Sequence, residues 1–200
     1  MGQVLLISGP SGSGKSSLLN KLFSEFKNTY FSISSTTRAP REGEIDGVNY
    51  HFISKDEFET DIKAGLFLEW ASVHGNLYGT NLKPVIKAIN EGKIVILDID
   101  VQGFILARKQ DFALTSVFLT TKDKSTLENR LKKRGTESDE SIKERLKNAT
   151  TEMEYIKEYD YIVINDDLDE AYAKLRAIFI SMQNKSSNID INALKSKWQN

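Results

Sequence analysis

Short apolar runs alternate with segments of helical period along most of the chain. The runs are rich in β-branched residues and too short for typical helices, which favours buried strands. They are QVLLIS from Gln3, KIVILDID from Lys93, SVFLT from Ser116 and YDYIVIN from Tyr159. Buried strands that alternate with helices predict an α/β fold, with a mostly parallel sheet and helices on both of its faces.

The segment between the first predicted helix and Lys93 has a different pattern. Its short strand-like pieces, VNYHFIS and LFLEWASV, are separated by glycines, which predicts a small β-rich insertion over residues 35–83. Within it, Ser54 and Glu57 have the spacing of a capping box. A short helix is therefore expected to begin after Ser54 and to end at Gly65.

A charge-dense stretch comes after the third apolar run. Its helical period is broken at Gly135, and Ser138 can cap a second helix, so the pattern predicts a pair of helices over residues 123–155. A last amphipathic helix is expected from Leu168 to Met182, before a polar, weakly patterned and loosely held tail. The predicted organisation is a core of residues 1–34, 84–122 and 156–184, with an insertion at 35–83, a helical pair at 123–155 and a tail at 185–200.

Composition narrows the functional classes. The 200 residues carry a formal net charge of -1, which removes the whole-chain electrostatic argument for nucleic acid or an anionic membrane as a partner. The absence of cysteine excludes disulfides and thiolate catalysis and fits a reducing compartment. The N-terminal apolar run is too short for a signal peptide or a membrane span, so a cytoplasmic protein is expected. Any site for an anion must be local.

The strongest local signal is GPSGSGKS, which lies between the first predicted strand and the first predicted helix. This is the P-loop pattern in its required context, where glycines let backbone N–H groups surround phosphate oxygens and the helix N-terminus adds its dipole. Lys15 is expected to reach the β- and γ-phosphates, and Ser16 to ligate Mg²⁺. The expected ATP-binding residues of this loop are Gly9, Pro10, Ser11, Gly12, Ser13, Gly14, Lys15, Ser16 and Ser17.

Two carboxylates lie at the end of the second apolar run. Asp98 ends it and is placed to hold Mg²⁺ directly or through water, because P-loop proteins need an acid there. Asp100 lies two residues on, and would share the side of Asp98 if the strand continued. The alternative for each is a solvated carboxylate at a strand end.

A second anion site is suggested by SSTTRAPREGEIDGVNYHF, a stretch with neither helical nor strand period. Arg38 and Arg41 supply guanidinium groups, and Tyr50 and Tyr78 can each donate a phenolic hydrogen bond. An acceptor phosphate opposite the P-loop needs cations and donors of this kind and no general base. The tyrosines could equally be packing residues of short strands.

The P-loop, the carboxylates after the second apolar run and the basic loop together resemble the guanylate kinase family, whose members transfer phosphate from ATP to GMP. The stretches SSTTRAPREGEIDGVNYHF, EWASVHGNLYGT, ILDIDVQG and RLKKRGTESDESIKERL are similar to successive family blocks, in the same order, over about Gln3 to Met182. The resemblance implies a P-loop core, an insertion that binds GMP and a helical lid. It also implies ATP and GMP as substrates. We further expect dGMP as a second acceptor, and a monomer or homodimer.

The resemblance further implies site residues. The GMP phosphate is expected on Arg38, Arg41, Tyr50 and Tyr78, and guanine on Ser34, Glu69, Thr80 and Asp100. The implied catalytic cations are Lys15, Arg38, Arg134 and Arg145, the last two from the lid, while Arg130 and Asn165 resemble contacts to the adenine of ATP. Charge alone does not separate the lid arginines from neighbouring lysines, and Asn165 could equally turn a loop.

The expected role of Glu69 also has a chemical basis. Guanine presents N1–H and its 2-amino group side by side as donors, and one ionised carboxylate can accept from both. Adenine presents an acceptor at N1, so a buried carboxylate would face a lone pair without a hydrogen bond, which disfavours binding of adenine.

Three other functions share part of these features. A catalytically inactive, guanylate-kinase-like interaction domain would not need the complete P-loop set. A P-loop kinase acting on a phosphorylated sugar would not need Glu69, Thr80 and Asp100 as a guanine-reading set. A regulatory GTPase would carry an NKxD motif after its third or fourth strand, and this chain has none there.

Overall fold

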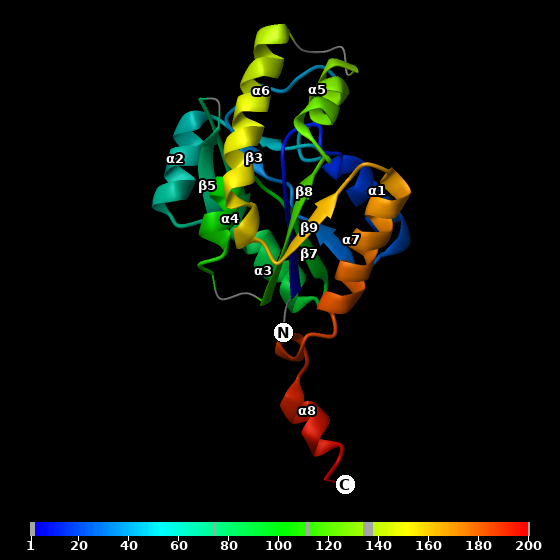
Figure 1. Ribbon diagram of the computed structural model, residues 1–200. Coiled ribbons are helices and arrows are strands. Elements are labelled where there is room, and N and C mark those ends of the chain that lie inside the picture. The colour runs from blue at the N-terminus through cyan, green and yellow to red at the C-terminus, as the bar shows by residue number, and fades with distance from the viewer. Residues whose placement is uncertain (1–2, 74, 111–112, 134–137, 200) are drawn as a thin grey trace.

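The centre of the protein is a parallel sheet, seen in a computed structural model that describes residues 3–73, 75–110, 113–133 and 138–199 (Figure 1). Its five strands lie in the order β2-β7-β1-β8-β9, and every neighbouring pair is parallel. The strands are β1 (Gln3–Ser8), β2 (Thr29–Phe31), β7 (Ile94–Asp98), β8 (Ala113–Thr120) and β9 (Tyr161–Ile164). The four predicted apolar runs form β1, β7, β8 and β9, whereas β2 was not predicted.

Helices cover both faces of this sheet, because successive side chains of each strand alternate between two cores. Leu5 and Ile7 of β1 pack with α1 (Lys15–Glu25) and α7 (Leu168–Met182). Val4 and Leu6 of the same strand pack with α3 (Leu82–Asn90) and α4 (Val101–Ala107). The α/β prediction with helices on both faces is confirmed, including the bounds of the last long helix.

A second, smaller sheet forms the insertion. Its strands lie in the order β4-β3-β6-β5, with β3 (Ser35–Thr36) antiparallel to β6 (Asn76–Asn81) and parallel to β4 (His51–Phe52). The outer strand β5 (Phe67–Val73) is antiparallel to β6. Before α2 (Lys55–Lys63), the Ser54 hydroxyl accepts a hydrogen bond from the Glu57 backbone N–H at 3.2 Å, so the predicted N-cap is confirmed.

Two helices, α5 (Lys124–Lys133) and α6 (Asp139–Glu152), form the predicted helical pair. They share a small apolar core of their own, which consists of Leu127, Leu131, Ile142, Leu146 and Ala149. Ser138 caps α6 as predicted, accepting from the Ser141 N–H at 3.3 Å. The short helix η1 (Met153–Glu158) leads from the pair back to β9. In Figure 1 the pair stands at one end of the central sheet.

The tail is more structured than the polar sequence predicted. It contains η2 (Ser186–Asn188) and α8 (Ile191–Ser196), and α8 projects away from the body at the end opposite to α5 and α6 (Figure 1). Its base is attached to the core, because the Lys185 ammonium donates to the Thr115 hydroxyl at 3.0 Å and Asn188 is buried.

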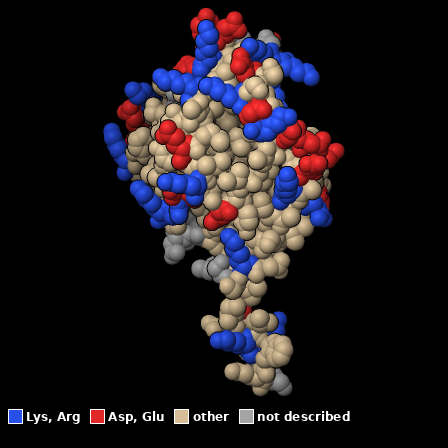
Figure 2. Space-filling model, in the orientation of Figure 1, with Lys and Arg blue, Asp and Glu red and all other residues tan. Residues whose placement is uncertain are grey.

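Charges of both signs are interspersed over the surface. Figure 2 shows Lys and Arg side chains mixed with Asp and Glu around the helical pair and the flanks, with uncharged residues across the centre of that face. Among the described helices, none is long and apolar enough to cross a membrane.

Candidate active site

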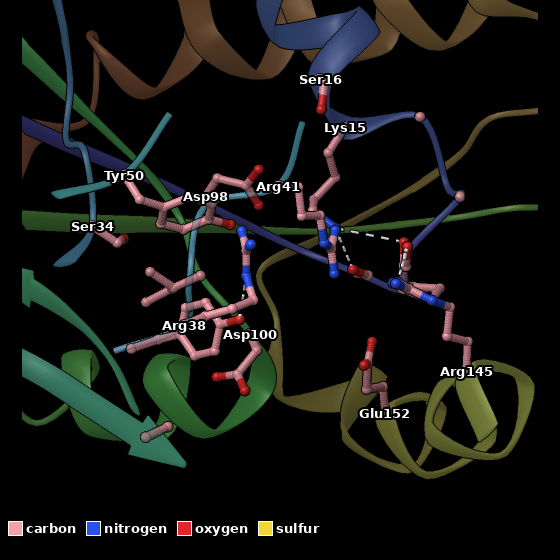
Figure 3. Close-up of a pocket in the computed structure, with 18 of the residues that line it drawn as sticks. Lys15, Ser16, Ser34, Arg38, Arg41, Tyr50, Asp98, Asp100, Arg145 and Glu152 are labelled. Atoms are coloured by element: carbon pink, nitrogen blue, oxygen red, sulfur yellow. Dashed lines mark hydrogen bonds between the residues drawn. The ribbon is translucent and has the colours of Figure 1, made fainter. Parts of the chain in front are cut away.

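One cavity of about 450 Å³ brings the P-loop, the insertion and α6 together (Figure 3). From the P-loop it is lined by Gly9, Pro10, Ser11, Gly12, Gly14, Lys15 and Ser16. From the other elements it is lined by Ser34, Arg38, Arg41, Glu44, Tyr50, Glu69, Ala71, Tyr78, Asp98, Ile99, Asp100, Arg145 and Glu152. Residues predicted from separate parts of the sequence to bind two different phosphates therefore share one space.

The P-loop has the backbone geometry that its glycines allow. Gly9, Gly12 and Gly14 have φ angles of 143°, 90° and 99°, which residues other than glycine rarely adopt. Space is restricted as well: a Cβ on Gly9 would collide with the Leu119 carbonyl, and one on Gly14 with the Asn165 amide. The loop is thus held closely against the ends of β8 and β9, with α1 beginning at Lys15.

Asp98 lies at the floor of the cavity because of strand register. It is the last residue of β7 and pairs with Ile7 of β1, the strand that leads into the P-loop. Burial raises the pKa of Asp98, and the nearby Lys15 ammonium partly opposes that shift. An ionised Asp98 would therefore be stabilised by additional positive charge in the cavity.

Asp100 does not continue the strand. β7 ends at Asp98, and Asp100 is instead the N-cap of α4, where its carboxylate accepts from the Gly103 N–H at 2.8 Å. The chain turns into a helix here, so the strand does not continue and the condition for Asp100 to share the side of Asp98 is not met. Asp100 still lines the cavity, and burial raises its pKa.

Arg38 is fixed by several acceptors at the edge of the small sheet. Its Nη2 donates to Glu44 Oε1 at 2.8 Å, and its Nε donates to the Tyr78 hydroxyl at 3.2 Å. The guanidinium also lies over the Tyr50 ring, 5.4 Å from its centroid. Arg41, Tyr50 and Tyr78 line the same part of the cavity, so the four residues predicted to hold a phosphate lie together.

Glu69 forms the deep wall on the insertion side. It is only 5% exposed, and its Oε1 accepts from the Thr80 hydroxyl at 2.6 Å. Burial raises the pKa of Glu69 to about 7, with the Asp100 carboxylate adding to the shift and Thr80 opposing it. Thr80 is itself fully buried behind Glu69, so in this conformation it acts on the cavity through that carboxylate.

Arg145 connects α6 to the P-loop. Its Nη1 donates to the Ser11 hydroxyl at 2.7 Å, and Figure 3 shows the side chain directed from α6 towards the loop. The side chains of α5 also reach the loop, because a Cβ on Gly12 would lie 3.1 Å from Leu131 and 3.2 Å from Leu127. Arg134, the other predicted cation of this pair, falls outside the described residues.

Arg130 and Asn165 lie together beside Ser13 of the P-loop and do not line the cavity. Arg130 Nη2 donates to the Asn165 carbonyl at 2.9 Å, and Asn165 Nδ2 donates to the Ser13 carbonyl at 2.8 Å. Within the described part of the chain, Asn165 Oδ1 and Ser13 Oγ are buried without a hydrogen-bond partner. Both residues predicted for the adenine side are therefore beside the loop.

Two acidic residues of the cavity wall were missed by sequence reasoning. Glu44 pairs with Arg38, and its place three residues after Arg41 in a basic loop was the available signal. Glu152 lies on α6 two turns after Arg145, which places both on one face of the helix. Neither acid carries a motif of its own.

The comparisons with known proteins agree with this geometry. The family model described as "Guanylate kinase" matches residues 1–182. This chain belongs to the guanylate kinase family. The chain is 53% identical to the guanylate kinase of Campylobacter jejuni (strain RM1221), over 98% of this chain and 97% of that protein. It is 45% identical to the guanylate kinase of Helicobacter pylori (strain ATCC 700392 / 26695), over 98% of this chain and 96% of that protein.

The fold is also similar to that of a solved guanylate kinase structure. The crystal structure of guanylate kinase from Anaplasma phagocytophilum aligns with a TM-score of 0.78 at 29% sequence identity. The alignment covers 96% of this chain and 93% of that one. The resemblance read from the sequence blocks is confirmed.

Proposed function

We propose that this guanylate kinase transfers the γ-phosphoryl group of ATP to the phosphate of GMP, and also of dGMP. The observation that carries the proposal is the single cavity in which Lys15 of a P-loop faces the Arg38, Arg41, Tyr50 and Tyr78 cluster. A nucleotide donor and a phosphorylated acceptor can meet there.

The donor occupies the P-loop. Its backbone N–H groups and the N-terminus of α1 hold the β- and γ-phosphates, with Lys15 reaching their oxygens. Arg130 and Asn165 lie where they could contact the adenine side of ATP, since both bond to the outer turn of the loop.

The acceptor phosphate binds on the insertion of residues 35–83. Arg38 has further N–H groups beyond those that meet Glu44, Tyr78 and the Ala39 carbonyl, and guanidinium groups suit phosphate oxygens. Arg41, Tyr50 and Tyr78 add charge and donors around it. Together they offset the repulsion between two phosphates that must approach each other.

Guanine is read by carboxylates deeper in the same wall. Glu69, held by Thr80, accepts from N1–H and the 2-amino group, and Asp100 and Ser34 complete the set. This requires ionised Glu69, so GMP binding is expected to lower the raised pKa of that group by offering it two donors.

Transfer then needs positioning more than covalent chemistry. An oxygen of the GMP phosphate attacks the γ-phosphorus in line, the bond to the β,γ-bridging oxygen breaks, and ADP leaves. Arg145 reaches this region from the helical pair of residues 123–155, and Arg134 is proposed to act with it. Closure of the pair would exclude water that could otherwise hydrolyse ATP.

Mg²⁺ fits the donor side of the cavity. The described residues include no group of three or more His, Cys, Asp or Glu side chains placed to hold a metal by themselves. Mg²⁺ is commonly held by one or two protein oxygens together with substrate phosphates and water, and Ser16 with the buried Asp98 supplies such a pair. When bound, Mg²⁺ would neutralise charge on the β- and γ-phosphates.

The test is ADP production from ATP and Mg²⁺ with one acceptor at a time: GMP, dGMP, AMP, CMP, UMP and a phosphorylated sugar. Turnover confined to GMP and dGMP is expected. Turnover with the sugar phosphate would keep the role of Lys15 and overturn the guanine-reading set. No turnover with any acceptor would favour the inactive interaction domain. The cytoplasmic location and the monomer or homodimer state stay predictions.

A further inference from the structure

Gly103 lies against the carboxylate of Glu69. It sits in the first turn of α4, a helix that packs on β5, the strand that carries Glu69. A Cβ built at Gly103 would lie 2.6 Å from Glu69 Oε2 and 3.0 Å from its Cδ. Carbon atoms in good packing contact stay about 3.5 Å or more apart, so a hydrogen fits at this point and a methyl group does not.

The Glu69 carboxylate cannot easily move aside. Its other oxygen accepts from the Thr80 hydroxyl at 2.6 Å, so the group is held between that hydroxyl and the bare Cα of Gly103. The surroundings are closed, since Glu69 is 5% exposed and Thr80 is fully buried. A methyl at position 103 would push the carboxylate into the cavity or break its bond to Thr80.

The backbone itself does not require glycine at this position. Gly103 is helical and is absent from the glycines with positive φ, so alanine could adopt its conformation. Alanine in a helix ordinarily raises stability relative to glycine. The reason for glycine at this position is therefore the restricted space, which Glu69 limits most closely and the Ile99 Cβ, at 3.3 Å, limits less.

We propose that Gly103 is a specificity-determining, positioning residue, whose missing side chain sets where Glu69 meets the guanine edge. The inference rests on the proposed function, because it assumes that Glu69 reads guanine. The same turn also holds Asp100, whose carboxylate accepts from the Gly103 N–H at 2.8 Å. One short turn thus places both carboxylates of the guanine side.

The test compares GMP with IMP, which keeps N1–H and lacks the 2-amino group. In Gly103→Ala, the ratio of kcat/KM for GMP to that for IMP is expected to fall about tenfold, with the KM for ATP unchanged, because a displaced Glu69 no longer accepts from both donors. Gln102→Ala is the matched control, since it changes an exposed side chain in the same turn and should keep the wild-type ratio. An unchanged ratio in Gly103→Ala overturns the proposal.

A second background separates this inference from the proposed function. In Glu69→Ala the obstructing carboxylate is absent, so adding Gly103→Ala should leave the GMP to IMP ratio of that background almost unchanged and should not lower its Tm. An equal loss in both backgrounds, or a double variant that fails to fold, would mean that Gly103 acts independently of Glu69. If Glu69→Ala alone keeps the wild-type ratio, the guanine-reading role of Glu69 fails instead.

Discussion

The Arg38 guanidinium donates to Glu44 Oε1 at 2.8 Å, and the other oxygen of that carboxylate accepts from the backbone N–H of Arg41 at 2.8 Å. One acid therefore joins both arginines of the proposed phosphate site. The hydrogen bond from Arg38 is the main cause that lowers the pKa of Glu44, so this carboxylate is ionised at neutral pH. Glu44 fixes the direction of the guanidinium before any substrate phosphate arrives.

Removing the Glu44 carboxylate should weaken acceptor binding. In Glu44→Ala, Arg38 loses the partner that orients it, and the KM for GMP is expected to rise about three- to tenfold while the KM for ATP stays constant. Glu44→Gln keeps one acceptor oxygen, so its KM for GMP should lie between those of the wild type and Glu44→Ala. Glu42→Ala, an exposed neighbour, is the control. An unchanged KM for GMP in Glu44→Ala would show that Arg38 is oriented without Glu44.

Lys15→Ala is expected to abolish phosphoryl transfer with little loss of GMP binding. The ammonium donates to the Gly9 carbonyl of the P-loop, and it acts on Asp98 and Asp100 only by opposing the rise of their pKa values. Transfer is measured by ADP production, and GMP binding by calorimetry. Lys21→Ala serves as the control, because Lys21 is on the same helix and pairs with Asp169 outside the cavity. An active Lys15→Ala variant would remove Lys15 from its assigned role.

Arg145→Ala should depress kcat more than the affinity for either nucleotide. Its guanidinium already contacts Ser11 in the P-loop, so it is close to where charge develops on the transferring group. Steady-state kinetics with both substrates separate the effects on kcat and KM. Lys147→Ala, an exposed cation on the same helix, should behave as wild type. A defect confined to KM would argue against a transition-state contact.

Much of the fold could be predicted because its signals are local. Four of the five central strands are continuous apolar runs, and the caps Ser54 and Ser138 lie directly before the helices that they start. The exception is β2, which has only three residues, all half-buried. Strand β2 is an edge strand that, among the described strands, pairs only with β7, and three residues carry too little pattern to predict that pairing.

The site was predictable where chemistry is tied to a motif or to a family block. The P-loop and the Arg38 and Arg41 loop were identified in this way, and the structure brings them to one cavity. Glu44 was missed because an acid in a charged loop is usually solvated, and its role depends on a side-chain contact. Gly103 was missed for a similar reason: the space that it leaves is filled by Glu69, 34 positions earlier in the sequence.

The buried Glu69 carboxyl should make stability depend on pH. Its pKa in the folded protein is about 7, against an ordinary value of 4.5. Between these values the folded protein keeps a proton that the unfolded chain has lost, so the free energy of unfolding falls as pH rises from 4.5 to 7. The loss approaches about 3 kcal/mol above pH 7, on the basis of 1.36 kcal/mol for each pKa unit.

Glu69→Gln tests this dependence, because the amide resembles the protonated carboxyl and does not titrate. We expect the variant to be more stable than the wild type at pH 8 and nearly equal to it at pH 5, in urea unfolding without GMP. Asp100, whose pKa is also raised, remains in both proteins, and because its carboxylate raises the pKa of Glu69 the difference between the profiles reports Glu69 together with this coupling. Glu42→Gln changes an exposed acid and should leave the pH profile unaltered. Parallel profiles for the wild type and Glu69→Gln would mean that Glu69 titrates near its ordinary value.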